Sequence, residues 1–284
     1  MCKIAHNRMT AYCKNIIYTL SKFVYAHKMD TRFWGPSGWR LLHLITYTYD
    51  PITQRHTMRK FLETIPYILP CKFCRASLTD YYKLHPFSPA LESRAKLTRW
   101  IYTIHNDVNA KLRSQGLLTA ADPSFKQVND TYKTWINTSV PTERLQTFWD
   151  FLFSVAYGHP YDTARTAKPM PKCPPYATTC KSKATRNKWN TLGPSDRFHF
   201  YKQFWQTLPD ILEPALRIQW VRALKTNSPS LACRRSIIAW LWRMRCALDI
   251  DYKDPYTEIC SKVASYSSDC SSSVRAKTCR KKRR

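Results

Sequence analysis

Two cysteines separated by two residues, Cys71 and Cys74, are the side chains in this sequence best suited to redox chemistry. They follow Pro70, which disfavours helix before it and is well tolerated in a first helical turn. Cys71 is therefore expected at a helix N-terminus, with Cys74 one turn later on the same face. Backbone amides at a helix start stabilise a thiolate, and Lys72 and Arg75 add positive charge. The pattern predicts a redox-active dithiol.

Half of a zinc site has the same cysteine spacing, so a zinc-binding module is the first alternative. Cys71 and Cys74 would need two further ligands, which His43 or His105 could supply. The sequence contains no second Cys-x-x-Cys and no His-x-x-x-His to complete a usual zinc spacing. No metal ligand set is therefore predicted.

Composition limits the class of protein. The 284 residues carry 46 Lys and Arg against 19 Asp and Glu, a formal charge of +27 that favours contact with polyanions. Five glycines, with no P-loop and no Gly-x-Gly-x-x-Gly, argue against the common glycine-rich phosphate loops. Eleven cysteines without a recognisable signal peptide fit redox or metal chemistry better than a secreted disulfide scaffold.

The last ten residues, 275–284, include seven Lys or Arg and no acid. This end is expected to be flexible, and it suggests a second alternative, a basic nucleic-acid-binding or virion-structural protein. The same residues are compatible with a nuclear signal. No apolar run is long enough to cross a bilayer, because Arg243 and Arg245 interrupt the best candidate.

Apolar residues at spacings of three and four predict an all-α fold. Four helices are expected at about 39–47, after a Gly35-Pro36-Ser37 turn, 53–68, 71–84 and 90–112. Their short links suggest an up-down bundle, followed by a short fifth helix near 125–135. A second helical region begins near Pro141, with a long loop at 159–190 and helices at about 195–206, 209–224 and 230–248. The expected divisions are an extension at 1–28, a domain at 29–140, a helical domain at 141–256 and a cysteine-containing basic tail at 257–284.

Two of these helices carry polar and flat side chains on one face. Trp39 and His43 are four residues apart, and Tyr102, His105 and Asn109 recur at spacings of three and four. Such residues suit a large heteroaromatic ligand held between helices. Taken alone, either set is better explained as ordinary core and surface residues.

Three motifs together are more specific. They are Trp-x-x-Leu-His at 39–43, Cys-x-x-Cys at 71–74 and His-Asn-x-Val-Asn-x-x-Leu at 105–112. In this order and at these intervals they resemble the Erv/ALR family of FAD-linked sulfhydryl oxidases, over roughly residues 32–136. The segment Phe125…Val128…Tyr132 loosely resembles the stretch that follows in the family.

The resemblance implies a helical bundle that holds FAD, usually as a homodimer, and that oxidises thiols. Cys71 would exchange with an incoming dithiol from a protein substrate or a thioredoxin-like redox partner, and Cys74 would face the flavin. Reduced flavin would pass its electrons to molecular oxygen, giving hydrogen peroxide. The residues that the resemblance assigns to FAD are Trp39, His43, Tyr102, His105, Asn106, Val108, Asn109, Lys111 and Leu112.

The sequence also departs from many family members. Pro36 stands where many have an arginine that reaches the flavin nucleotide, and Asp122 stands where a lysine lies near its phosphates. No cysteine lies between Cys74 and Cys173, so the pair that staples the domain in many cellular members is absent. This absence, the Trp34-Gly35-Pro36 turn and the additional helical region resemble members from large double-stranded DNA viruses. The resemblance therefore suggests a viral enzyme located in the infected cytoplasm or the virion.

Family members often load the redox pair from a second, shuttle pair of cysteines. Cys233 and Cys246 fall in apolar helical stretches and are expected to be small core residues. The candidates for a shuttle pair are Cys2 with Cys13, Cys173 with Cys180, or two of Cys260, Cys270 and Cys279, with the last group ranked first.

Overall fold

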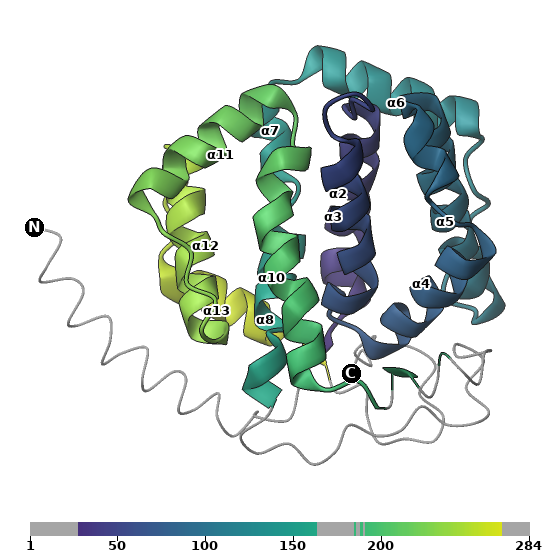
Figure 1. Ribbon diagram of the computed structural model, residues 1–284. Helices are drawn as coiled ribbons and strands as arrows, with labels where there is room; N and C mark the ends of the chain where they lie inside the picture. Colours follow the sequence, from purple (N-terminus) through teal and green to yellow (C-terminus); the bar gives the residue numbers. More distant parts are fainter. Residues whose placement is uncertain (1–27, 164–184, 186–187, 190, 269–284) are drawn as a thin grey trace, which may run out of the picture.

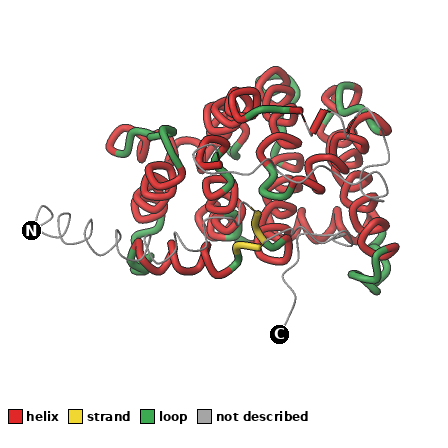
Figure 2. The backbone as a smooth tube through the Cα atoms, turned by 90° about the horizontal axis from the view of Figure 1, so that it is seen from below, coloured by secondary structure: helices red, strands yellow, loops and turns green. Residues whose placement is uncertain are grey.

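The computed structural model describes residues 28–163, 185, 188–189 and 191–268. Within this part of the chain the regular structure is helical apart from two short strands, with loops between the helices, as Figure 2 shows, which confirms the predicted all-α class. The strands present there are β1 (Lys28–Met29) and β2 (Ser267–Ser268), which pair antiparallel with Lys28 opposite Ser268. This short ladder joins the start of the described chain to its end.

The first helix, α2 (Thr31–Tyr47), begins before the turn that was expected at Gly35-Pro36-Ser37. Asp30 caps it, because its carboxylate accepts a hydrogen bond from the backbone N–H of Arg32 at 2.9 Å. The indole N–H of Trp34 donates to the Met29 carbonyl at 3.3 Å. These contacts hold the first turns in helical form, and Pro36 is accommodated inside the helix. The predicted turn at Gly35-Pro36-Ser37 is therefore wrong.

Three further helices complete the expected set of four. They are α3 (Arg55–Ile68), α4 (Lys72–Leu84) and α5 (Arg94–Ser114), with the 3₁₀ turn η1 (Pro89–Glu92) before α5. The predicted apolar face of α3 is confirmed, since Met58, Phe61, Leu62 and Ile65 have no exposed surface. The fifth helix, α6 (Phe125–Thr138), begins with a capping box at Ser124 and lies across the top of the view in Figure 1.

Further helices follow residue 140 in the described part of the chain. Of these, α10 runs beside α3, and α8 packs against α2 (Figure 1). Their bounds are α7 (Pro141–Gln146), α8 (Trp149–Tyr157), η2 (Pro160–Thr163), α10 (Pro194–Ile211), α11 (Pro214–Thr226), α12 (Arg234–Leu248) and α13 (Tyr256–Ser265).

The helices before and after residue 140 share one hydrophobic core. The buried rings of Phe61 and Phe204 stack at 5.4 Å between α3 and α10. Gly38 of α2 lies so close to Phe151 of α8 that a Cβ atom there would be 2.9 Å from the ring. The boundary at residue 140 stays a prediction, but the helices that follow it pack directly on the bundle.

Two expectations for the C-terminal part need correction. Residues 257–265, expected in the basic tail, belong to α13, because Tyr256, Ile259 and Val263 recur at helical spacing and are buried. Cys233 and Cys246 are partly exposed rather than core residues. Cys233 is the N-cap of α12, and Cys246 lies in its last turn.

Several expectations fall outside the described residues. These are the extension at 1–27, most of the loop at 159–190 and the basic end at 269–284. Among the described residues, no helix combines the length and apolar character needed to span a membrane.

Candidate functional site

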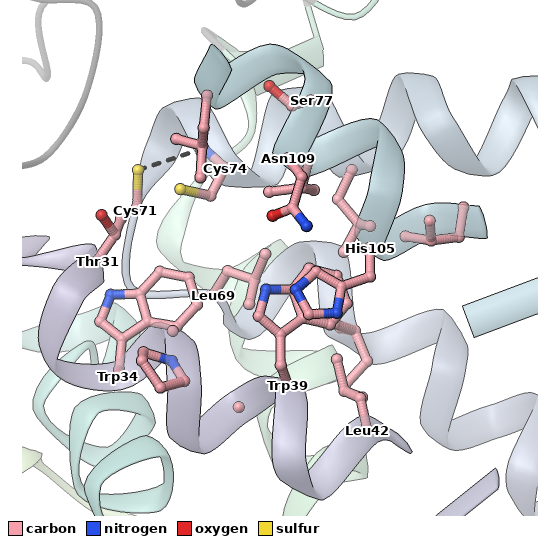
Figure 3. Close-up of a pocket in the computed structure, with 18 of the residues that line it drawn as sticks. Thr31, Trp34, Trp39, Leu42, Leu69, Cys71, Cys74, Ser77, His105 and Asn109 are labelled. Atoms are coloured by element: carbon pink, nitrogen blue, oxygen red, sulfur yellow. Dashed lines mark hydrogen bonds between the residues drawn. The ribbon is translucent and has the colours of Figure 1, made fainter. Parts of the chain in front are cut away.

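A cavity of about 560 Å³ opens between α2, α4 and α5 (Figure 3). Cys71 and Cys74 line it from the start of α4, and Trp39 and His105 line it from α2 and α5. Its volume lies within the range of small-molecule sites in proteins, about 300–1,000 Å³. The structure therefore brings the dithiol and the aromatic residues of the three motifs to one cavity.

The local geometry of the dithiol follows from the residues before it. Leu69 is extended, with φ −53° and ψ 134°, as a residue before proline should be. Cys71 is the N-cap of α4, and its sulfur accepts a hydrogen bond from the backbone N–H of Cys74 at 3.3 Å. Cys71 has no exposed surface, whereas Cys74 is partly exposed. The predicted helix start at the Cys pair is confirmed.

The environment separates the acidities of the two thiols. Burial raises the pKa of Cys71, but hydrogen bonds from the Cys74 thiol and backbone N–H, helped by Lys111 and Arg75, lower it to about 7. The hydrogen bond to Cys71, burial and the charge of the Cys71 thiolate raise the pKa of Cys74 well above its usual value. The pair thus holds its first negative charge mainly on Cys71.

Flat side chains stack along the opposite wall of the cavity. The rings of Trp39 and His105 are parallel within 12°, with centroids 3.9 Å apart. His43 Nε2 lies 3.0 Å from His105 Nδ1, and the His43 ring stacks on Tyr132 at 4.9 Å. Burial lowers the pKa of His43 to about 3, with help from His105, and burial lowers that of His105 to about 4. Both imidazoles are therefore neutral at neutral pH.

Polar side chains of α5 are anchored near the cavity. Asn109 Nδ2 donates to Asp122 Oδ1 at 2.7 Å, and Asp122 pairs with Arg113 at 2.5 Å. Lys111 Nζ donates to Ser77 Oγ of α4 at 2.8 Å, beside the dithiol. Asp122 thus orients Asn109 and neutralises Arg113.

Comparison with known proteins gives a consistent result. The model of the Erv1/Alr family matches residues 36–133. The chain is 37% identical over 87 residues to the mitochondrial FAD-linked sulfhydryl oxidase of Saccharomyces cerevisiae, covering 30% of the chain and 45% of the relative. A putative FAD-linked sulfhydryl oxidase of Invertebrate iridescent virus 3 is 30% identical over 92 residues, or 31% of the chain and 62% of the relative.

A second iridescent virus relative establishes the family to which the chain belongs. A putative FAD-linked sulfhydryl oxidase of Invertebrate iridescent virus 6 is 32% identical over 93 residues, which are 30% of the chain and 83% of the relative. The chain belongs to the Erv1/Alr family.

The Erv1/Alr match is confined to α2–α6 and the segments between them. The helices after α6 lie outside this match. The chain covers less than two thirds of the length of the first two relatives. No solved structure matches the chain significantly. The helices from α7 to α13 must therefore be interpreted from their own contacts.

The predicted cofactor residues of the Erv1/Alr region divide into two groups. Tyr102, whose hydroxyl donates to the Pro123 carbonyl at 2.9 Å, and Asn106 are not among the lining residues. His43 does not line the cavity either, but it is hydrogen-bonded to His105, which does. The predicted residues that line the cavity are Trp39, His105, Val108, Asn109, Lys111 and Leu112.

Some lining residues were not among the predicted site residues. Gln115 lines the cavity from just beyond α5, and its Oε1 is buried with no hydrogen-bond partner among the described residues. Tyr132 of α6 also lines it. The Phe125…Tyr132 segment pointed to Tyr132, whereas no motif signalled Gln115.

The described residues bear on two further hypotheses, a zinc site and a shuttle pair of cysteines. Three or more His, Cys, Asp or Glu side chains do not cluster into a metal site anywhere in the described chain. Cys260 lies on α13 and is partly exposed. The remaining shuttle candidates, which lie outside the described residues, are Cys2, Cys13, Cys173, Cys180, Cys270 and Cys279.

Proposed function

We propose that this protein is an FAD-dependent thiol oxidase that forms disulfide bonds in protein substrates and reduces oxygen to hydrogen peroxide. The observation that carries the proposal is the single cavity lined by both Cys71 and Cys74 and by the stacked rings of Trp39 and His105. A dithiol and a site for a planar ligand thus line the same cavity. Family membership supports this function over the zinc-binding alternative.

The residues present fit a flavin nucleotide. The cavity combines flat rings with an unsatisfied polar atom, Gln115 Oε1, which is a buried acceptor without a partner among the described residues. Arg40 and Lys111 line the same cavity and suit an anionic diphosphate. When bound, FAD supplies a two-electron acceptor for the dithiol and a route from it to oxygen. The residues expected to hold FAD are Trp39, His105, Val108, Asn109, Lys111 and Leu112, with His43 fixing the His105 ring.

The cysteines carry out the thiol exchange. A substrate thiolate attacks the Cys71 sulfur of the Cys71–Cys74 disulfide, the S–S bond breaks and Cys74 leaves as a thiolate. A second substrate thiolate then attacks the substrate sulfur of the mixed disulfide, and Cys71 leaves. Two substrate thiolates become one disulfide, and the Cys pair gains two electrons. Because a low thiol pKa favours departure, the lowered pKa of Cys71 assists the second step.

Because Cys71 is buried, thiol exchange at its sulfur requires a local movement of the protein. Cys71 has no exposed surface, so attack at its sulfur needs residues around the Pro70 turn to move. Cys74 is partly exposed and lines the cavity, which suits a role next to the flavin. We assign substrate exchange to Cys71 and electron transfer toward the cofactor to Cys74.

The partners are proposed on the same basis. We expect thiol-containing viral proteins or a thioredoxin-like redox partner as substrates, and a homodimer as the active form. We expect a viral enzyme that acts in infected cytoplasm or virions, and the iridescent virus relatives support the viral part of this expectation. Contact with nucleic acid through residues 275–284, and a nuclear location, stay predictions on residues outside the described chain.

The test is oxygen uptake with a dithiol substrate, together with flavin absorbance. Cys74→Ser and Cys71→Ser should bind flavin and remain yellow, but each should lose at least about a hundredfold in turnover, because neither can form the disulfide. Cys246→Ser is the matched control and should keep wild-type turnover. A wild-type preparation without flavin, or full activity in both site variants, would refute the proposal.

A further inference from the structure

Arg75, the residue after Cys74, is a buried cation with few partners. It is 4% exposed, and its Nη1 donates to the Leu69 carbonyl at 2.8 Å. Its guanidinium carbon lies 5.7 Å from the ring centroid of Trp189. Its Nε is buried without a hydrogen-bond partner among the described residues, and none of the ion pairs between those residues includes Arg75.

A second arginine approaches from α10, outside the family match. Arg197 is partly exposed, but its guanidinium reaches inward. Its Nε donates to the Tyr67 carbonyl at 3.3 Å, and its Nη2 donates to the Gly158 carbonyl at 3.3 Å. A Cβ atom on Gly158 would lie 3.7 Å from Cα of Pro70. Arg197 thus links the end of α3 to the end of α8, beside the turn that leads into Cys71.

The two guanidinium groups also influence each other. Burial, and then the positive charge of Arg75, lower the pKa of Arg197 well below its ordinary value. Burial lowers the pKa of Arg75 to about 10, against the opposing effect of Cys71 and Cys74, so Arg75 stays charged at neutral pH. The two arginines thus bond carbonyls two residues apart, those of Leu69 and Tyr67, on the segment that leads into Cys71.

Burying a guanidinium is costly unless a counter-charge compensates it. Arg75 follows Cys71 by four residues at the start of α4, and its side chain bonds the carbonyl of Leu69, two residues before Cys71. The negative charge of the Cys71 and Cys74 sulfurs favours the protonated form of Arg75. The electrostatic effect is mutual, since after the hydrogen bonds from Cys74 the charges of Lys111 and then Arg75 favour the Cys71 thiolate by lowering the pKa of Cys71. The thiolate of the dithiol is therefore the counter-charge that this arrangement provides.

We propose that Arg75, with Arg197 of α10 behind it, is the buried cation that stabilises the thiolate of the Cys71–Cys74 pair. This inference rests on the proposed redox function of that pair. Arg75 positions a positive charge close to the dithiol. Arg197 brings α10, which lies outside the family match, to the redox centre. Because a thiolate exists only in the reduced pair, such a cation favours the dithiol and makes the Cys71–Cys74 disulfide more oxidising.

The test is anaerobic equilibration of the full-length protein with reduced and oxidised glutathione. One Cys71–Cys74 disulfide and two glutathione thiols exchange to give two protein thiols and one glutathione disulfide. Differential alkylation and peptide mass spectrometry then measure the reduced fraction. Arg75→Met should shift the equilibrium about tenfold toward the protein disulfide, equivalent to about 30 mV. Arg197→Met should shift it less in the same direction, and Arg75→Lys should stay near wild type.

The matched control is Arg245→Met, which removes the same charge from α12, where Arg245 lies 3.8 Å over the Tyr252 ring. It should leave the equilibrium unchanged, and an equal shift there would refute a local effect. A folded Arg75→Met protein, judged by circular dichroism, with a wild-type equilibrium would overturn the inference. Should Arg75→Met not fold, Arg197→Met decides, because a shift supports the inference and no shift refutes it. Oxygen uptake by the wild type tests the proposed function separately.

Discussion

At the scale of single residues, the paired histidines show how burial selects a charge state. His43 is 2% exposed, and its Nδ1 has no partner among the described residues. Its Nε2 meets His105 Nδ1 at 3.0 Å, which requires one ring to donate and the other to accept. Two positive rings at this distance would repel each other. The neutral pair therefore keeps the His105 ring fixed against Trp39 at the cavity wall.

This arrangement makes stability depend on pH. The pKa values of His43 and His105 fall from 6.5 to about 3 and about 4 in the folded protein, so the unfolded chain binds protons first as pH drops. The free energy of unfolding should decrease from pH 6.5 toward pH 4 and be unaffected by these groups above pH 6.5. In His43→Gln the slope should be smaller by up to about 1.4 kcal/mol per pH unit. Urea unfolding across this range measures it.

His56 provides the control for that experiment. It is exposed on α3, so His56→Gln should keep the wild-type slope. An unchanged slope in His43→Gln would mean that the His43–His105 pair is not the source of the pH dependence.

At the scale of helices, the contact between α2 and α8 depends on one glycine. Gly38 is buried in α2, and a Cβ atom there would meet the Phe151 ring at 2.9 and 3.2 Å. The hydroxyl of Ser37, the preceding residue, accepts from the Phe151 N–H at 3.0 Å and donates to the Thr147 carbonyl at 2.8 Å. The close approach of these helices thus brings α8 to the bundle that carries the cavity.

Two glycines in one helix allow a matched test of this contact. Gly38→Ala should destabilise the protein, because overpacking costs about 1–3 kcal/mol and exceeds the gain in helix propensity. Gly35→Ala, with nothing within 4 Å of its Cβ position, should instead gain about 0.5–1 kcal/mol. Urea unfolding of both variants measures the difference. Equal stability of the two would show that α8 does not constrain Gly38.

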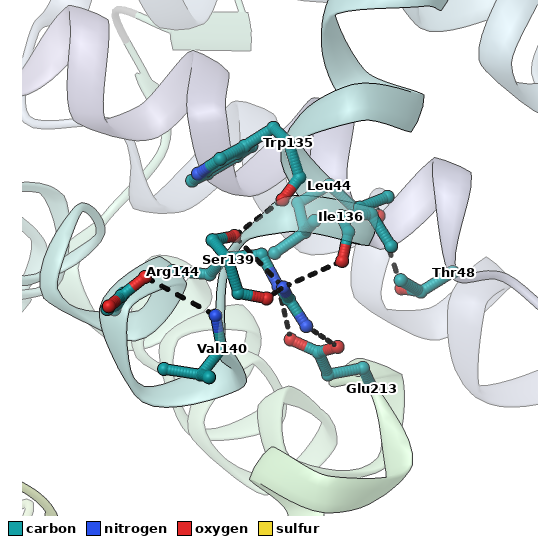
Figure 4. A network of polar contacts seen from close by, with 9 residues as sticks. Leu44, Thr48, Trp135, Ile136, Ser139, Val140, Arg144 and Glu213 are labelled. Carbon is teal, nitrogen blue, oxygen red and sulfur yellow. Dashed lines mark hydrogen bonds and ion pairs between the residues drawn. The ribbon is translucent and has the colours of Figure 1, made fainter.

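At the scale of the whole molecule, a buried ion pair joins the family region to the helices beyond it. Arg144 of α7 pairs with Glu213, the N-cap residue of α11, at 2.6 Å, and their side chains are 4% and 10% exposed. Arg144 also donates to the Ile136 carbonyl at 3.1 Å and to the Ser139 carbonyl, at the end of α6 (Figure 4). One guanidinium therefore ties α6, α7 and α11 together.

Breaking this pair should destabilise the whole protein. Glu213→Gln leaves the Arg144 charge buried without a carboxylate and should lower the free energy of unfolding by about 3–5 kcal/mol. The double variant Arg144→Met, Glu213→Leu should lose less, because no uncompensated charge remains. Urea unfolding monitored by circular dichroism measures both. Asp130→Asn, which removes an exposed pair with Lys126, is the control and should leave stability unchanged.

Much of the fold and of the family assignment was available from the sequence, because both depend on local spacing. Apolar residues three and four apart identified α3 and the buried face of Met58, Phe61 and Ile65. The proline before Cys71 located the start of α4. Helical spacing also placed His43 on the face of Trp39. These features are determined by residues that are neighbours along the chain.

Other features were decided by the tertiary structure, because they arise from residues far apart in sequence. The start of α2, where local rules suggested a turn, is held by the C-terminal part of the chain. The Asp30 N–H donates to the Tyr266 carbonyl at 2.9 Å, and the Phe33 ring stacks on Tyr266 at 4.3 Å. Packing of His105 over His43 removes His43 from the cavity that its spacing had implied. The burial of Cys71 and the approach of Arg197 toward Arg75 depend on how α3, α8 and α10 meet around the Cys pair. Burial and charge at a site are sums over the whole fold, which local sequence patterns do not contain.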